Sequence, residues 1–181
     1  MDIEQTSIDG VLIITARKFP DDRGFFAPVF RSADLEAAGI THGWVQENQS
    51  LSLRKGTIRG LHFQKSPFAQ AKLVRVVRGA VLDVCVDIRP GSATFGQHVS
   101  VELTADNMRQ VYVPSGFAHG FCTIEDHTEV LYKVSTDWSP SHEAGLLWSD
   151  PELAIAWPVS AEDVTIVSRD ASWPPLAALY R

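Results

Sequence analysis

Three short segments of the chain carry more polar side chains than the apolar patterns around them require. They are residues 55–64, 70–75 and 113–121. The side chains in them that could do chemistry are Arg59, His62, Gln64, Lys72 and His119. Imidazoles transfer protons near neutral pH, and cations stabilise negative charge. If the fold brings these segments together, they can line a site for acid–base chemistry on a polar ligand.

Each of these residues also has a simpler structural interpretation. A lone histidine beside a glycine is more often hydrogen-bonded within the fold than catalytic, and a lone lysine is usually solvated. Tyr132 shares a strand face with Val130 and Val134. This pattern fits a hydroxyl pointing into a cavity, or a core tyrosine whose hydroxyl is satisfied at the rim. The placement of the two histidines, the lysine, the arginine and the tyrosine on separate strands of one predicted barrel favours the functional interpretation.

A metal site is a second interpretation of His62 and His119, because histidines on neighbouring barrel strands can chelate iron, manganese or zinc. His62 is followed by Phe63, Gln64 and Lys65, so its own segment offers no second histidine or glutamate. We therefore expect a site without metal.

The elements that must position these side chains are predicted to be β-strands. β-Branched residues in partial period-2 alternation are cut by turn residues about every ten positions, which is typical of an all-β sandwich or barrel. The predicted strands are residues 72–78, 81–88, 99–103, 109–113 and 129–134. No long helical pattern separates them, which argues against βαβ units. A small barrel can hold one ligand in its lumen.

The remaining segments are predicted to be peripheral. Residues 32–39 indicate one short helix with Ser32 as its N-cap and Gly39 as its stop. The three prolines after Trp157 predict an irregular segment with a short helix. We expect a single domain with an N-terminal extension over residues 1–50, a barrel core over about 51–140 and a C-terminal wrap over 141–181.

Alternation sorts the side chains of the predicted strand at residues 81–88. The even-numbered positions are apolar, whereas Asp83, Cys85 and Asp87 share the opposite face. Two acids among apolar neighbours predict a polar lumen or a structural pair. Cys85 and Cys122 are the only cysteines and lack CxxC spacing, which favours buried thiols in a reducing compartment.

Composition limits the classes of partner. The chain has 181 residues, of which 45% are hydrophobic and 21% charged, as in one ordinary soluble domain. Its net charge of −6 provides no global attraction to nucleic acid or anionic membranes. No apolar stretch approaches the roughly 20 residues that span a bilayer, and the acidic start is unlike a signal peptide. We expect a cytoplasmic protein without nucleic-acid or membrane partners.

Eight motifs run in order over roughly residues 22–170. They are residues 22–26 (DRGFF), 45–48 (VQEN), 59–64 (RGLHFQ), 72–75 (KLVR), 83–87 (DVCVD), 113–121 (VPSGFAHGF), 131–133 (LYK) and 148–151 (WSDP). Together they resemble the dTDP-4-dehydrorhamnose 3,5-epimerase family, and the combination of the third and sixth motifs is highly specific. The resemblance implies a cupin-type jelly-roll barrel with short peripheral helices, usually a homodimer, that needs no metal or nucleotide cofactor.

The resemblance also implies a reaction. Members convert dTDP-4-dehydro-6-deoxy-D-glucose to dTDP-4-dehydro-L-rhamnose by inverting carbons 3 and 5. The ketone at carbon 4 makes the neighbouring protons removable, because the carbanion is delocalised onto oxygen as an enolate. By family analogy His62 is the base and Asp170 orients its imidazole and stabilises the protonated form. Lys72 would place a cation beside the oxyanion, and Tyr132 would return a proton from the other side.

Nine further residues match positions that hold the substrate. Arg23, Arg59 and His119 match contacts to the diphosphate or the sugar, for which the planar donors of arginine are suited. The others match contacts to the nucleotide: Gln46, Glu47, Asn48, Trp138, Glu143 and Arg169. Trp138 falls where the family often has a tyrosine that stacks on thymine, and an indole offers at least as much π surface.

The chain departs from the family pattern at several positions near the predicted mouth. Pro28 stands where many members have glutamate, Asp137 replaces an aromatic residue, and Ala71 replaces a glycine before Lys72. The loop between residues 48 and 62 is one residue longer than in many members. These departures bear on nucleotide and sugar preference more than on the reaction type.

Strict alternation along a strand places Arg59 on the opposite face from His62, although the family pattern places both at the site. A bulge at Gly60 could re-aim one of them. Otherwise Arg59 would reach the ligand from a rim or across a dimer interface.

Three other functions stay open from the sequence. One is a mono-epimerase that inverts only carbon 3 or carbon 5. Another is a metal-dependent cupin oxygenase or isomerase that uses His62 and His119 as ligands. The third is a catalytically silent sugar-binding module, which the presence of both His62 and Tyr132 makes the least favoured.

Overall fold

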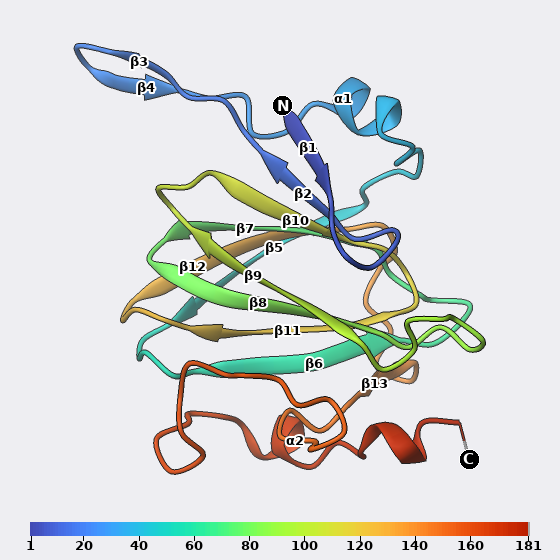
Figure 1. Ribbon diagram of the computed structural model, residues 1–181. Coiled ribbons are helices and arrows are strands. Elements are labelled where there is room, and N and C mark those ends of the chain that lie inside the picture. The colour runs from blue at the N-terminus through green and yellow to red at the C-terminus, as the bar shows by residue number, and fades with distance from the viewer. Residues whose placement is uncertain (181) are drawn as a thin grey trace.

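The computed structural model describes residues 1–180 and consists mainly of antiparallel strands in two sheets (Figure 1). One sheet has the order β1 (Asp2–Gln5), β2 (Leu12–Thr15), β10 (Arg109–Val113), β7 (Lys72–Arg78), β12 (Thr128–Val134), β5 (Gln46–Ser52). The other has the order β13 (Glu143–Gly145), β6 (Ile58–Gln64), β11 (Phe117–Thr123), β8 (Ala80–Asp87), β9 (His98–Thr104). The predicted all-β class, a cupin-type jelly-roll barrel with short peripheral helices, is confirmed.

The five predicted strands correspond to β7, β8, β9, β10 and β12, each within one residue at either end. Their β-branched side chains pack into a core between the sheets that includes Val74, Val111 and Val130. Two of the strands that the prediction missed, β1 and β2, lie in residues 2–15 and form one edge of the six-stranded sheet. The predicted boundary near residue 50 stays a prediction.

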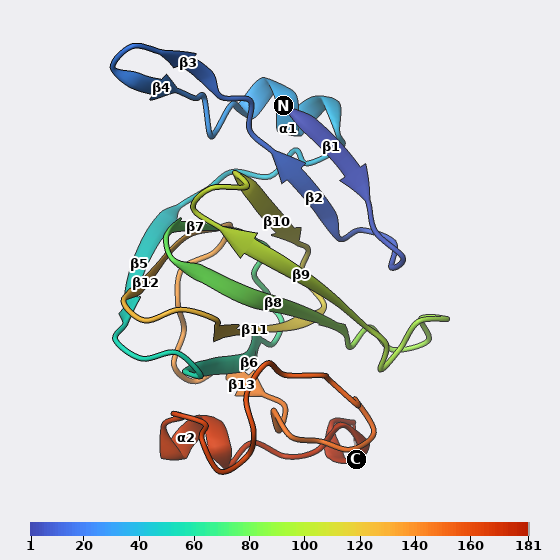
Figure 2. The ribbon, with the colours of Figure 1, turned by 60° about the vertical axis from the view of Figure 1, so that its left-hand side comes forward.

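The two faces of β8 are sorted as alternation predicts. Val81 and Cys85 belong to the core between the sheets. Val84 and Val86 point outward, where Leu146 and other residues of the C-terminal segment cover them. Figure 2 shows this segment lying along the outer side of the five-stranded sheet, next to β6 and β13. The wrap therefore closes one end of the molecule over residues that would otherwise be exposed.

The helices are short: α1 (Ser32–Ala37), α2 (Ser168–Ala171) and the 3₁₀ helix η1 (Leu176–Ala178). The predicted N-cap at Ser32 is wrong, because Ser32 is already the first helical residue and Arg31 occupies the cap position without a side-chain cap hydrogen bond. Gly39 does stop the helix: its φ is +86°, and its N–H donates to the Glu36 carbonyl. Leu35 anchors α1 on the sheet.

A two-stranded hairpin, β3 (Phe19–Asp21) and β4 (Gly24–Phe26), projects from the body near the N-terminus (Figures 1 and 2). Every residue of its strands is exposed, including Phe25 at 56% and Phe26 at 69%. The sequence pattern predicted neither strand of this hairpin.

Candidate active site

A cavity of about 930 Å³ lies between the two sheets, and residues 165–167, 169 and 170 of the C-terminal wrap contribute to its lining. Its size is within the usual range for a small-molecule site. Eleven of the thirteen predicted site residues line it: Gln46, Asn48, Arg59, His62, Lys72, His119, Tyr132, Trp138, Glu143, Arg169 and Asp170. They come from β5, β6, β7, β11, β12, β13, α2 and the segment after β12, so only the tertiary fold brings them together.

His62 lies on β6 against a carboxylate from the C-terminal wrap. Its Nε2 is 2.9 Å from Oδ1 of Asp170, although the N–H does not point well enough at the oxygen for a hydrogen bond. Asp170 is 2% exposed and also accepts from the backbone N–H of Gly60 at 3.1 Å and from Nε of Arg169 at 3.2 Å. Burial raises the pKa of Asp170, but the neighbouring His62 ring, the Gly60 N–H and Arg169 outweigh it and keep the pKa below its ordinary value. The carboxylate is therefore ionised and faces the imidazole.

A bulge in β6 places Arg59 and His62 at the same cavity. His119 pairs with His62 and Phe121 pairs with Arg59, so β6 has one residue more than β11 over this stretch. At the bulge the backbones of Gly60 and Gly120 approach closely. A Cβ on Gly60 would lie 2.5 Å from Cα of Gly120, so the position requires glycine. The bulge predicted at Gly60 is confirmed.

A second imidazole–carboxylate pair lies beside the first. Nε2 of His119 is 2.8 Å from Oδ2 of Asp83, and Sγ of Cys85 donates to the other carboxylate oxygen at 3.7 Å. Burial lowers the pKa of His119, and Lys72 and His62 act in the same direction, although Asp83 opposes them. His119 is thus a neutral imidazole near pH 7, and its Nε2–H donates to the buried Asp83 carboxylate.

Lys72 supplies a cation to the inner end of the cavity. Its Nζ donates to the carbonyl of His62 at 3.5 Å. Burial lowers its pKa from 10.5 to about 8, although the negative charges of Asp83 and Glu143 oppose the shift. The side chain is half-buried and charged at neutral pH, so it can stabilise a developing oxyanion in the cavity.

Tyr132 faces the cavity from the opposite sheet. It lies on β12, paired with Asn48 of β5, and packs against the inter-sheet core. Burial raises the pKa of its hydroxyl, so Tyr132 is protonated at neutral pH and can donate a proton. His62 and Tyr132 therefore reach the cavity from opposing sheets.

The outer part of the cavity carries groups suited to a larger polar ligand. Trp138 is 57% exposed and presents a free aromatic surface. Glu143 and Arg169 form an ion pair with 3.0 Å between the charged atoms. Arg59 is held by Ser52 and by the Leu51 carbonyl at the edge of β5. Gln46 and Asn48 share one face of β5, and their side chains are hydrogen-bonded to each other.

Two predicted residues lie away from this cavity in the chain described. Glu47 points to the other face of β5, where it is ion-paired with Lys133 at 2.6 Å, because strand alternation separates it from Gln46 and Asn48. Arg23 lies at the turn of the β3–β4 hairpin and pairs with Asp21, with 89% of its side chain exposed. Neither residue contributes to the cavity of its own chain.

Asp83, which is fully buried, and Gln64, which lines the cavity, have roles that sequence reasoning missed. Asp83 was predicted only as part of a polar lumen or a structural pair, and it proves to hold His119 inside the barrel. The sequence marks Gln64 only as unexpectedly polar, and in the structure it lines the cavity. The polarity of each inside an apolar strand was the available signal.

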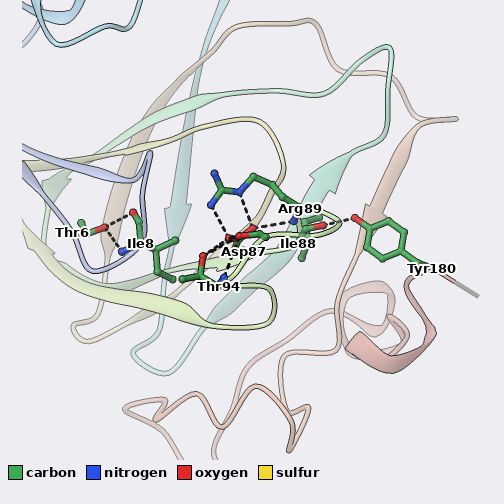
Figure 3. Close-up of polar contacts among 8 residues, drawn as sticks. Thr6, Ile8, Asp87, Ile88, Arg89, Thr94 and Tyr180 are labelled. Atoms are coloured by element: carbon green, nitrogen blue, oxygen red, sulfur yellow. Dashed lines mark hydrogen bonds and ion pairs between the residues drawn. The ribbon is translucent and has the colours of Figure 1, made fainter.

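Asp87, on the same face of β8 as Asp83, has a structural role (Figure 3). Its carboxylate accepts from Arg89, Ser92 and Thr94 at the end of the barrel. Burial raises the pKa of Asp87, but these donors reverse the shift and keep it far below its ordinary value. In the same region Tyr180 donates to the Ile88 carbonyl and fastens the C-terminal segment.

Among residues 1–180, no three His, Cys, Asp or Glu side chains are grouped as metal ligands. The helices within the same residues include none long and apolar enough to cross a membrane.

Comparison with known proteins identifies the family. The family model for dTDP-4-dehydrorhamnose 3,5-epimerase matches residues 5–178. A protein of that name from Sinorhizobium fredii is 48% identical, over 99% of this chain and 91% of its own length. The crystal structure of the epimerase from Bacillus anthracis with TDP and pyrophosphate bound has a TM-score of 0.93 and 48% identity, covering 96% of this chain and 98% of that one. The epimerase structure from Legionella pneumophila, in complex with dTDP-4-keto-L-rhamnose, has a TM-score of 0.94 and 43% identity, covering 98% of this chain and 94% of that one.

Proposed function

The chain belongs to the dTDP-4-dehydrorhamnose 3,5-epimerase family, and from that membership we propose that its cavity epimerises a dTDP-4-keto-6-deoxy sugar at carbons 3 and 5. The observation that carries the proposal is the meeting of three groups in one cavity: the His62 imidazole against Asp170, the Lys72 ammonium beside the His62 carbonyl, and Tyr132 on the opposing sheet. A base, a cation and an acid are the groups that enolisation beside a ketone requires.

The proposed reaction moves protons only and needs no oxidant, reductant or other co-reactant. The His62 imidazole takes the proton from the carbon beside the ketone, and the electron pair of that C–H bond moves to the carbonyl oxygen as an enolate. Asp170 stabilises the imidazolium that forms. When the enolate collapses, Tyr132 donates its proton to the same carbon from the other side. The proton held by His62 then returns to the tyrosinate through solvent, so no net charge remains.

Lys72 limits the pH range of this step. Its ammonium can stabilise the enolate oxygen only while it is protonated, and its pKa of about 8 leaves it charged at neutral pH. Lys72 contacts the backbone carbonyl of His62, the proposed general base. Its cation is therefore placed near the enolate oxygen that forms when His62 removes the proton. We propose this role for Lys72 and no role as a nucleophile.

The outer groups would hold the nucleotide. We propose that Trp138 stacks on the base and that Arg59 and His119 contact the diphosphate or the sugar. The neutral state of His119 favours the sugar, because a neutral ring with its Nε2 on Asp83 offers the ligand an acceptor and no charge. The outer part of the cavity, which would hold the nucleotide, has further polar side chains: Gln46, Asn48, Glu143 and Arg169.

We further propose that the protein is a homodimer in which the β3–β4 hairpin of one copy reaches the cavity of the other. The support is the exposed hairpin with Phe25 and Phe26 on β4, and the exposed Leu51 and Leu53 at the cavity edge. In this arrangement Arg23 would meet a diphosphate that its own chain does not reach. Mixing Arg23→Ala with His62→Ala protein tests it, since mixed dimers would regain activity while either variant alone would not.

The cytoplasmic location also stays a proposal. It is supported by the two free thiols, Cys85 and Cys122, which are buried and unpaired.

Solvent exchange tests the proposed reaction. The protein is incubated with dTDP-4-dehydro-6-deoxy-D-glucose in D₂O, and the sugar is examined by NMR and mass spectrometry. Deuterium at carbons 3 and 5 with inversion at both supports the proposal, whereas inversion at a single carbon would assign a mono-epimerase. Absence of exchange at either carbon contradicts it. Stoichiometric iron or manganese together with loss of activity to a chelator would instead assign a metal-dependent cupin enzyme.

A further inference from the structure

Gln64 is a buried amide at the end of β6, two residues beyond His62. The side-chain amide makes three hydrogen bonds, all to backbone groups outside β6. Nε2 donates to the carbonyl of Phe68 at 2.7 Å and to the carbonyl of Asp137 at 3.1 Å. Oε1 accepts from the backbone N–H of Ser139 at 2.6 Å. One side chain therefore uses both of its donor hydrogens and its acceptor on two separate loops.

Two of these partners, Asp137 and Ser139, flank Trp138 in the chain. The amide of Gln64 thus bridges the residue before and the residue after Trp138, in the way that a neighbouring strand would pair with them. The segment 137–139 belongs to no strand or helix, so it has no ladder of its own to fix it. The two hydrogen bonds from Gln64 replace that ladder.

Further contacts hold the segment 137–139 in place. Ser139 Oγ is 2.8 Å from Nδ1 of His142, and the His142 ring packs on Phe68 with 4.5 Å between ring centroids. Phe68 is itself the third partner of Gln64. Gln64 is therefore the buried centre of a closed set of contacts that surrounds the base of Trp138, while the indole itself stays 57% exposed.

We propose that Gln64 is a positioning residue for Trp138, and through it sets the affinity of the site for the nucleotide base. The inference rests on the proposed function, because it takes Trp138 as the surface on which the base stacks. Glutamine suits this position because two carbonyls and one N–H converge on it. A glutamate would direct an oxygen at the two carbonyls, and a methionine would leave all three backbone groups without a partner.

The test measures dTDP affinity and steady-state kinetics of Gln64→Met, with Gln64→Asn as a smaller change should the first fold poorly. We expect the dissociation constant for dTDP and KM to rise about tenfold in Gln64→Met, with kcat changed less than about threefold, because the His62 end of the strand is untouched. A matched control is Gln110→Met. Gln110 is also buried and donates to a loop carbonyl, that of Val29, and neither residue lines the cavity. We expect it to lower the melting temperature without changing dTDP affinity.

A double-mutant cycle separates positioning from direct contact with the ligand. If Gln64 acts through Trp138, Gln64→Met causes no further loss of dTDP affinity in a Trp138→Ala background. Equal affinity of the wild type and the folded Gln64 variants would overturn the inference, and so would full additivity of the two substitutions. Either result leaves the proposed function standing if the wild type binds dTDP. A wild type that does not bind dTDP would overturn the proposed function as well.

Discussion

Two imidazole–carboxylate pairs lie at the cavity, with similar separations and different surroundings. His62 with Asp170 and His119 with Asp83 have separations of 2.9 and 2.8 Å, and the two histidines are direct partners in the β6–β11 ladder. The His62 side chain is 22% exposed and its carboxylate comes from the wrap, whereas the His119 side chain is 7% exposed and its carboxylate comes from the centre of the barrel.

This difference shows that exposure and the source of the carboxylate decide what a pair can do. A pair at the cavity wall can accept a proton from a ligand and pass it to solvent. A pair enclosed in the barrel cannot exchange protons readily, and burial lowers the pKa of its imidazole. We therefore assign proton transfer to His62, and to His119 a fixed polar contact. The predictions below test that division.

Lys72 contacts the His62 carbonyl and interacts electrostatically with Asp83 and His119, and replacing it should have a large effect. We expect Lys72→Met to lower kcat by about 10²- to 10³-fold, as removal of an oxyanion partner does elsewhere. dTDP affinity should stay within about threefold, since the ammonium acts on the sugar. Steady-state kinetics and calorimetric titration with dTDP check both values. A variant with normal turnover would mean that the enolate is stabilised by other groups.

The same substitution should make the protein more stable at neutral pH. The pKa of Lys72 is about 8 in the folded state and near 10.5 when unfolded, so folding opposes its charge. The penalty is complete below pH 8 and disappears as pH rises toward 10.5. Because the side chain is only half-buried, we expect Lys72→Met to gain about 2 kcal/mol at pH 7 and little above pH 10.5. Urea unfolding at both pH values measures the difference, and a loss of stability at pH 7 would contradict it.

The pH dependence of turnover should follow the same group. As pH rises through about 8, Lys72 loses its charge and kcat should fall. Arginine stays protonated in this range, so the residual activity of Lys72→Arg should show no fall near pH 8. A wild-type profile that is flat from pH 7 to 9.5 would contradict the role given to Lys72.

The two carboxylates should separate activity from stability. We expect Asp170→Asn to lower kcat about 10²-fold, because the imidazolium loses its partner. Asp83→Asn should lower kcat less than tenfold but reduce the free energy of unfolding by about 1–3 kcal/mol, because it weakens a buried charge-assisted contact. Steady-state kinetics and urea unfolding of both variants measure these effects. Equal effects on kcat would contradict the assignment of proton transfer to the His62–Asp170 pair alone.

The smallest effect is expected at the mouth of the cavity. Trp138→Ala should raise KM and the dissociation constant of dTDP about tenfold by removing a stacking surface, and leave kcat nearly unchanged. Trp138→Tyr should retain most of the affinity. If Trp138→Ala changed kcat and not KM, the division of the cavity into a reacting and a nucleotide half would be wrong.

The sequence predicted the strands whose β-branched residues face the core, such as β7 and β10, because burial imposes that pattern. It did not predict β5, whose residues 46–50 are all polar because one face lines the cavity and the other is exposed. Alternation along the same strand could have excluded Glu47 from the cavity. The pairing of Asp170 with His62 came only from the family resemblance, since 108 residues separate them. No local pattern contains such a contact, or the bridge from Gln64 to the loop of Trp138.

The most direct test of the account compares the two histidines in proton exchange. Substrate deuterated at carbons 3 and 5 is mixed with wild type, His62→Ala and His119→Ala, and loss of deuterium to water is followed by mass spectrometry. We predict that His62→Ala slows exchange about 10³-fold while still binding dTDP, and that His119→Ala slows it less than about tenfold. Exchange at a near-normal rate in His62→Ala would contradict the assignment of the base.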